Sequence, residues 1–222
     1  MKKFYSAFLL AGILLLLNCA AHTNLAPVGK GKSTTYLSFG GPIIKAFGAR
    51  IPIPYATIGS NYGLTESVNL HGDLHLLSLA YQVVGLELGT AWFPIQHEGL
   101  RPSVGIMPGF LALASVKSGV DDRFRLYPQL AGSAAWRSGK NKIYTGFNFL
   151  FPLSSADYDD EAAAAIFSPF VGYQWQVGSR TKLFFELKWN AATTRSDQVA
   201  VDYLPVAGHG AITPLFAIER SF

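Results

Sequence analysis

Apolar and polar residues alternate along most of this chain. The clearest case is the segment 182–190, where Leu183, Phe185, Leu187 and Trp189 fall on one face and mostly charged or polar residues fall on the other. A period of two residues is typical of a β-strand with two different faces. The pattern predicts ten strands, mostly 9–13 residues long, at about 34–44, 50–62, 68–76, 81–93, 100–113, 124–136, 143–151, 167–177, 182–190 and 212–222.

The composition indicates where these strands lie. Half of the 222 residues are hydrophobic and only 14% are charged, which is too few charges for the surface of an ordinary soluble domain. Past residue 19, no segment offers the run of about 20 apolar residues that a spanning helix needs. The longest charge-free run there, 162–179, is interrupted by Pro169 and several polar residues. A closed barrel is the other structure that satisfies its backbone hydrogen bonds in lipid.

We therefore predict an all-β fold, a transmembrane antiparallel up-and-down β-barrel with short periplasmic turns and longer outer loops. The barrel domain covers residues 34–222 and has about ten strands. Eight strands are the alternative, because Pro42, Pro52 and Pro54 weaken the strand pattern of 34–62. The outer links near 45–49 and 77–80 are expected to be short.

The residue types on each face predict which one meets the lipid. The polar faces are rich in Gly, Ser, Asn and Gln, which suits a crowded lumen. Tryptophan and tyrosine lie on the apolar faces, as in the aromatic belts of membrane proteins; they are Trp92, Trp136, Tyr173, Trp175 and Trp189. The opposite orientation, with an apolar interior, would describe a lipocalin-like periplasmic carrier, which stays an alternative.

The N-terminus reads as an export signal. Lys2 and Lys3 precede an apolar stretch at 4–17 that is too short to span comfortably. The following Leu16-Leu17-Asn18-Cys19 resembles a lipobox, the bacterial lipoprotein signal, and Cys19 is the single cysteine. This resemblance implies a signal peptide at 1–18, lipidation of Cys19 and a tether at 19–33. The alternative is an ordinary signal peptide cut near Ala20-Ala21.

The C-terminus carries a second resemblance. Phe216, Ile218 and Phe222 alternate up to the last residue. This ending resembles the last strand of bacterial outer-membrane barrels, which the barrel-assembly machinery recognises. The chain thus resembles small bacterial outer-membrane β-barrel proteins with a lipoprotein-type signal. The resemblance implies the outer membrane of a diderm bacterium, with the N-terminus on the periplasmic side and outer-membrane lipids and lipopolysaccharide as partners.

The lumen of so narrow a barrel is expected to be filled by side chains that pair with one another. The residues predicted to form this polar network are His71, Asp73, His75, Glu87, Arg101, Arg123, Arg125, Lys182, Glu186, Lys188 and Glu219. A selective narrow pore is the alternative. His71, Asp73 and His75 also have ligand chemistry for zinc, but alternate strand residues lie about 6.5–7 Å apart, so we expect a polar stripe without metal and no cofactor.

Acidic residues of the predicted outer loops raise a last alternative. Asp159, Asp160 and His209 could be compared with the rim of omptin-type outer-membrane proteases, but no surrounding motif supports a rim hydrolase. Without Lys2 and Lys3 the net charge falls from +4 to near neutral, so no nucleic-acid partner is expected. The predicted function is a structural, adhesive or ligand-binding role at the cell surface, without catalysis.

Overall fold

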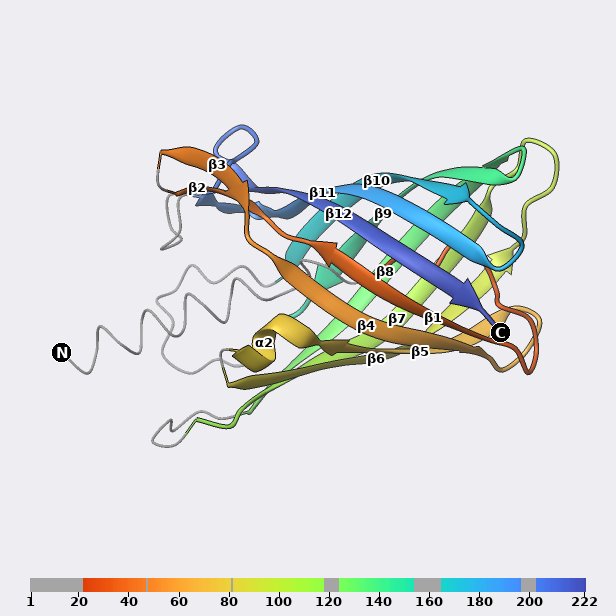
Figure 1. Cartoon of the computed structure of the whole chain (residues 1–222), viewed down its shortest axis with the longest axis horizontal. Coiled ribbons are helices and arrows are strands. Elements are labelled where there is room, and N and C mark those ends of the chain that lie inside the picture. Colours follow the sequence, from red (N-terminus) through yellow and green to blue (C-terminus); the bar gives the residue numbers. More distant parts are fainter. Residues whose placement is uncertain (1–21, 47, 81, 118–123, 154–164, 197–202) are drawn as a thin grey trace.

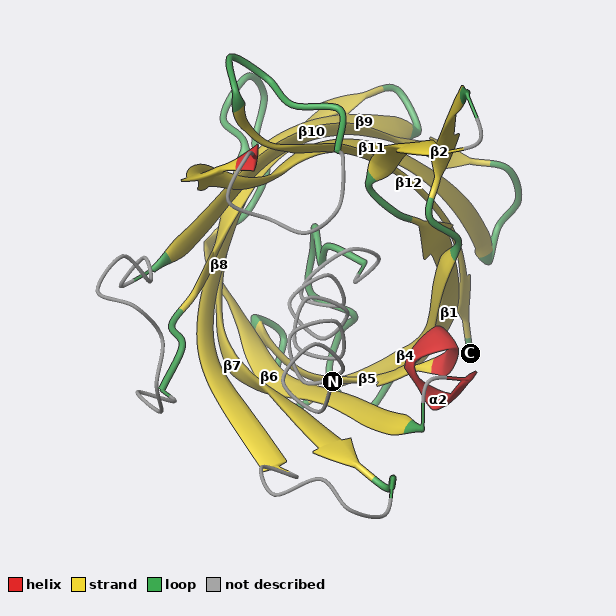
Figure 2. Cartoon of the chain, turned by 90° about the vertical axis from the view of Figure 1, so that its left-hand side faces the viewer, coloured by secondary structure: helices red, strands yellow, loops and turns green. Residues whose placement is uncertain are grey.

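Ten antiparallel strands close into a barrel in which every strand pairs with its sequence neighbours and the first pairs with the last. The computed structural model describes residues 22–46, 48–80, 82–117, 124–153, 165–196 and 203–222. Figure 2 looks along the barrel and shows the strands as a ring. The barrel strands are β1 (Ser33–Gly40), β4 (Tyr55–Gly63), β5 (Val68–His75), β6 (Val83–Ile95), β7 (Ser103–Ser115), β8 (Phe124–Ser138), β9 (Asn141–Leu150), β10 (Ile166–Gln176), β11 (Thr181–Arg195) and β12 (His209–Ser221).

The closing pair joins the two ends of the chain. β1 pairs with β12 from Thr34 opposite Ser221 to Gly40 opposite Leu215, and the amide of Phe222 donates to the carbonyl of Ser33 at 3.0 Å. The ten predicted strands and the all-β barrel fold are confirmed, and the eight-stranded alternative is wrong.

Two predicted strands each break into a barrel strand and a piece beyond the barrel. Segments 34–44 and 50–62 divide at the edge, so that β2 (Ile43–Ala46) pairs with β3 (Ala49–Pro52) in a separate hairpin. Gly41 permits the bend, because its φ is 156° and a Cβ there would lie 1.8 Å from the carbonyl oxygen of Ile53. Figure 1 shows this hairpin at the end opposite the C-terminus. The short outer link expected near 45–49 is therefore wrong.

The other expected short outer link contains the helix α2 (Leu76–Ala80), beside β4 and β6. Ser78 donates to the carbonyl of His75 at 2.7 Å, which fixes the helix to the end of β5. No helix in the described part of the chain is long and apolar enough to cross a membrane.

The faces of the strands are oriented as the sequence predicts. On β11, Phe185 and Leu187 are 49% and 48% exposed, whereas Glu186 and Lys188 between them are buried. Apolar side chains line the outside of the other strands too, and Trp92, Trp136 and Trp175 are among them. A polar lumen inside an apolar wall contradicts the lipocalin-like alternative.

Candidate functional site: the lumen and its N-terminal segment

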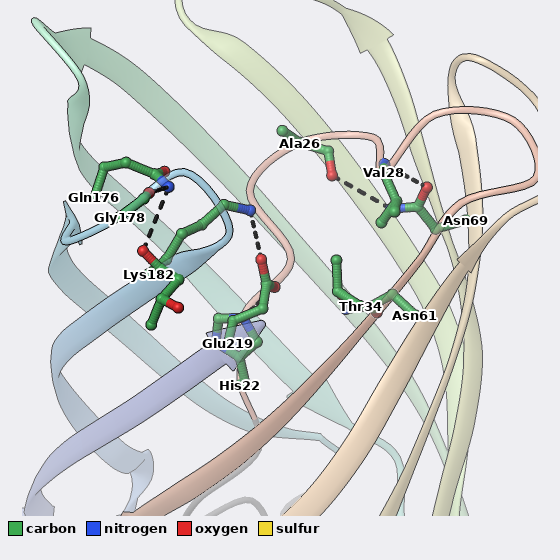
Figure 3. A network of polar contacts seen from close by, with 11 residues as sticks. His22, Ala26, Val28, Thr34, Asn61, Asn69, Gln176, Gly178, Lys182 and Glu219 are labelled. Atoms are coloured by element: carbon green, nitrogen blue, oxygen red, sulfur yellow. Dashed lines mark hydrogen bonds and ion pairs between the residues drawn. The ribbon is translucent and has the colours of Figure 1, made fainter. Parts of the chain in front are cut away.

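Residues 22–28, which we call the lumen segment, lie inside the barrel (Figure 3). They belong to the region predicted as a tether, whose remaining residues before 22 lie outside the described part of the chain. His22, Thr23, Asn24 and Leu25 are all less than 9% exposed. Part of the predicted tether thus fills the lumen, where it contacts β5, β8, β11 and β12.

Asn69 on β5 holds one end of the lumen segment. Its side-chain oxygen accepts a hydrogen bond from the amide of Val28 at 3.0 Å, and its amide nitrogen donates to the carbonyl of Ala26 at 3.3 Å. Asn69 is fully buried. A single side chain thereby satisfies a donor and an acceptor of a backbone that has no strand partner, as buried peptide groups require.

Two carboxylates hold the other end. Thr23 donates to Oε2 of Glu186 at 2.9 Å, and Nε2 of His22 lies 3.3 Å from Oε2 of Glu219. The second oxygen of Glu219 accepts from Nζ of Lys182 at 2.5 Å. Lys188 lies 3.5 Å from Glu186. Each buried carboxylate therefore faces both a lysine and the lumen segment, which offsets the cost of removing it from water.

An apolar contact anchors the middle of the lumen segment. Leu25 is 4% exposed and belongs to a cluster of buried side chains from the lumen face of several strands. This cluster includes Tyr144, Phe170, Phe184 and Leu215. The carbonyl of Asn24, next to it, accepts from Ser133 on β8 at 3.1 Å. The lumen segment thus crosses the barrel from β5 to β12 and is held along its whole length.

A second buried network lies further along the lumen. The hydroxyl of Tyr55 and Nδ1 of His75 form a hydrogen bond. Nε2 of His75 lies 3.9 Å from Oε2 of Glu87, whose Oε1 accepts from Gln129 at 2.6 Å. Asp73 stands directly opposite Glu87 in the register of β5 and β6. This chain of contacts joins β4, β5, β6 and β8 across the interior.

Glycines make room for this network. A Cβ at Gly59 would lie 2.4 Å from Oδ1 of Asp73 and 2.5 Å from the ring of Tyr36. A Cβ at Gly89 would lie 2.6 Å from the ring of His71, and one at Gly85 would lie 2.9 Å from His75. The side chains of His71 and His75 therefore lie in separate spaces, His71 beside Gly89 and His75 beside Gly85. Within the described ranges, no group of three or more His, Cys, Asp or Glu side chains is placed to hold a metal ion.

Most of the predicted network residues in the described ranges lie on the lumen face: His71, Asp73, His75, Glu87, Arg125, Lys182, Glu186, Lys188 and Glu219. Arg101 does not. It is exposed, and it forms an isolated bridge with Glu98 in the link before β7, because the strand begins only at Ser103. Arg123 and Cys19 lie outside the described part of the chain.

Sequence reasoning missed the partners that hold the lumen segment. Asn69 and Ser133 fall on the polar faces of predicted strands, so the alternation placed them in the lumen but did not indicate what they bind. The lumen segment itself has no periodicity, so no sequence signal pointed to its location.

The C-terminal residues lie as expected on the outer face. Ile218 is 40% exposed and Phe222 is 65% exposed, while Leu215 and Ala217 on either side of Phe216 are buried. Phe216 packs edge-on against Phe185 of the neighbouring strand, with ring centroids 5.0 Å apart. The apolar ending thus forms part of the outer surface of the barrel.

The end of the barrel that carries the β2–β3 hairpin has a separate hollow of about 520 Å³ between this hairpin and the start of β12. Its lining includes Lys45, Arg195, Tyr203 and His209. His209 is the member of the proposed hydrolase group that the structure describes, and its Nδ1 lies 3.0 Å from the carbonyl of Ala207. Asp159 and Asp160 lie outside the described ranges.

No protein-family model and no curated protein matches the chain. Solved structures of three barrel proteins are similar to it. The outer membrane protease OmpT from Escherichia coli is 10% identical over 90% of this chain and 99% of that chain, with a TM-score of 0.46. The NanC porin is 9% identical over 86% and 99%, with a TM-score of 0.46. The translocator domain of the autotransporter NalP from Neisseria meningitidis is 9% identical over 100% and 98%, with a TM-score of 0.42. Similarity this distant carries no functional assignment.

Proposed function

We propose that this chain is an integral β-barrel of a bacterial outer membrane that is closed by its own lumen segment and acts through its outer rim. Its role is structural, adhesive or ligand-binding at the cell surface, without catalysis. Lipopolysaccharide surrounds the outer half of the barrel in this proposal, and the barrel-assembly machinery inserts it. A lipid on Cys19 is not needed for this location, since the wall itself is apolar.

The observation that supports the proposal is the inverted distribution of side chains. Large apolar residues cover the outside, among them Val171 at 52% and Ile143 at 52% exposed, whereas Asp73, Glu186 and Lys188 are buried inside. So large an exposed apolar surface would aggregate in water but is the normal wall of a barrel in lipid.

The rim has the architecture of a binding surface. The amide of Leu204 donates to the carbonyl of Ile43 at 2.8 Å, and Tyr203 forms a bridge with Ile44. These contacts tie the link between β11 and β12 to the β2–β3 hairpin. The hairpin is thereby fixed beside the 520 Å³ hollow, so the rim offers a preformed concave surface for a ligand.

The experiment compares two single cysteines in a Cys19→Ser background. Ala49→Cys lies in the exposed hairpin, and Ser179→Cys lies in the exposed turn before β11 at the opposite end. We expect a membrane-impermeant maleimide to label only Ala49→Cys on intact cells, and both after lysis. Both proteins should shift in gel mobility on boiling. A protein that is released by salt without detergent, or labelling only at Ser179→Cys, would contradict the proposal.

A gated pore is a second candidate, and one observation favours it. The element that fills the lumen is a non-strand segment held by side-chain contacts, and it takes no part in the strand pairing that closes the wall. Cavities of about 110 Å³ and 230 Å³ flank it, lined by Lys142 and by Lys182 or Arg137. Planar-bilayer recording distinguishes the closed barrel from the gated pore. A wild-type protein that conducts steadily would favour the pore.

A further inference from the structure

The cavity of about 230 Å³ beside the lumen segment has a lining that bears positive charge. Its polar side chains are hydrogen-bond donors or can act as donors; they are Gln96, His97, Ser103, Arg137 and Lys142. None of the carboxylates in the described ranges lines it. We call this space the basic cavity. It lies where β8 ends and β9 begins, at the end of the barrel opposite the β2–β3 hairpin.

The strand register brings the two strongest cations of the basic cavity together. Arg137 on β8 stands directly opposite Lys142 on β9. Directly opposite residues of an antiparallel pair point to the same side, with Cβ atoms about 4.5–5.5 Å apart. The adjacent Trp136 and Ile143 are exposed on the outer face, so Arg137 and Lys142 point toward the interior. Like charges in this arrangement destabilise a sheet.

No carboxylate of the described ranges forms an ion pair with Arg137 or Lys142. Lys142 instead interacts electrostatically with Arg137 and Lys182, which have the same sign. Glu219 offsets part of this repulsion, but it is already bound to Lys182 at 2.5 Å and to His22 at 3.3 Å, as Figure 3 shows. A negative group placed in the basic cavity would therefore be strongly favoured.

A third group in the lining also lacks a partner. Nδ1 of His97 is buried and has no hydrogen-bond partner among the residues that the structure describes. His97 lies in the link between β6 and β7, across the cavity from the strands that carry the two cations. A buried polar atom of this kind costs free energy unless something in the cavity binds it.

We propose that the basic cavity binds a phosphate group between Arg137 and Lys142. A guanidinium presents a planar fork of donors that fits two phosphate oxygens, and an ammonium adds a compact positive charge. His97 supplies a further hydrogen bond. A single water needs only about 10–15 Å³ of such space, so 230 Å³ has room for the phosphate and part of the group that carries it. Arg137 is exposed, which leaves the cavity open to a ligand.

Inorganic phosphate and the headgroup of a phospholipid share this chemistry. The test is isothermal titration calorimetry of the protein purified in dodecyl maltoside without phosphate buffer. The two probes are inorganic phosphate and dihexanoyl phosphatidylglycerol, and sodium chloride at the same ionic strength is the blank. We expect saturable binding of one equivalent of at least one probe.

The variants show whether that binding occurs in the basic cavity. Lys142→Met and Arg137→Gln should each weaken it by about tenfold or more, the effect of losing one charge-assisted hydrogen bond. Lys142→Arg keeps the charge and should retain binding. Lys140→Met is the matched control, because Lys140 is exposed in the turn between β8 and β9 and does not line the cavity.

Heat-modifiable mobility reports whether each variant folds. Arg137→Gln changes an exposed side chain, so it keeps the test decisive if Lys142→Met does not fold. Binding of inorganic phosphate that the cavity variants lose supports the site with free phosphate as its ligand. Binding of dihexanoyl phosphatidylglycerol alone, lost in the same variants, supports it with a lipid headgroup. The absence of saturable binding of both probes, or binding that a folded cavity variant leaves unchanged, overturns the inference.

Discussion

Nε2 of His22 lies 3.3 Å from Oε2 of Glu219, although 197 positions separate the two residues in the sequence. The same carboxylate accepts from Lys182 on β11 at 2.5 Å. β12, which carries Glu219, is also the strand that closes the barrel against β1. The lumen segment is therefore bound to the same strand through which the barrel closes.

Leu25→Ala should loosen the lumen segment. The leucine is 4% exposed in the apolar cluster of the lumen, and such a truncation costs about 2 to 5 kcal/mol at a packed site. We expect the seated state to open part of the time, with transient conductance in planar bilayers that the wild type lacks. Leu64→Ala is the matched control, because Leu64 is 42% exposed in a turn. Identical silent traces for both variants would show that Leu25 does not retain the segment.

Gly59→Ala should destabilise the barrel. Its new methyl group would lie 2.4 Å from Asp73 and 2.5 Å from the ring of Tyr36, and overpacking of this kind costs about 1 to 3 kcal/mol. The measurement is the urea midpoint of refolded protein in detergent micelles. Gly178→Ala, which has nothing within 4 Å of the new Cβ, should leave the midpoint unchanged. Equal midpoints for the two variants would mean that the niche at Gly59 can relax.

Val171→Lys tests the lipid contact of the wall. Val171 lies in the middle of β10, opposite Leu187, and is 52% exposed. A lysine on the lipid face costs about 2 to 4 kcal/mol at the bilayer midplane and about 0 to 1 kcal/mol near the interface. Val177→Lys, at 53% exposure just beyond the strand end, is the matched control. In phospholipid vesicles, Val171→Lys should lower the free energy of unfolding by about 2 to 4 kcal/mol, and Val177→Lys by about 0 to 1 kcal/mol. A Val171→Lys variant as stable as the wild type would indicate that water, not lipid, surrounds β10.

Phe222→Ala should impair assembly and leave the fold intact. The side chain is 65% exposed, so its removal costs the folded barrel little packing. We expect less heat-modifiable protein in the outer membrane of cells but an unchanged refolding yield in detergent. Phe124→Ala, at 60% exposure, should behave as the wild type in both assays. An equal loss for the two variants in cells would speak against a terminal recognition signal.

The sequence was most informative where the surroundings impose a simple rule on each residue. A wall between lipid and a polar lumen requires a side chain of one kind or the other at every second position. This rule located ten strands and placed Asp73, Glu186 and Lys188 inside. It failed at 34–62, where the alternation continues through Gly40 and Gly41 although the chain leaves the barrel to form the β2–β3 hairpin. The prediction that Arg101 lies in the lumen was wrong for a similar reason, because a turn residue beside a strand can match the two-residue period by chance.

By itself the sequence thus determined the architecture of this protein and which face of each strand lies inside, because period-two alternation is a local property that the chain carries in every strand. Only the tertiary structure decided what fills the lumen. The lumen segment has no pattern of its own, and its partners Asn69, Ser133, Glu186 and Glu219 lie between 41 and 197 positions away. Each of these contacts exists only after the barrel closes and brings four distant strands around one peptide.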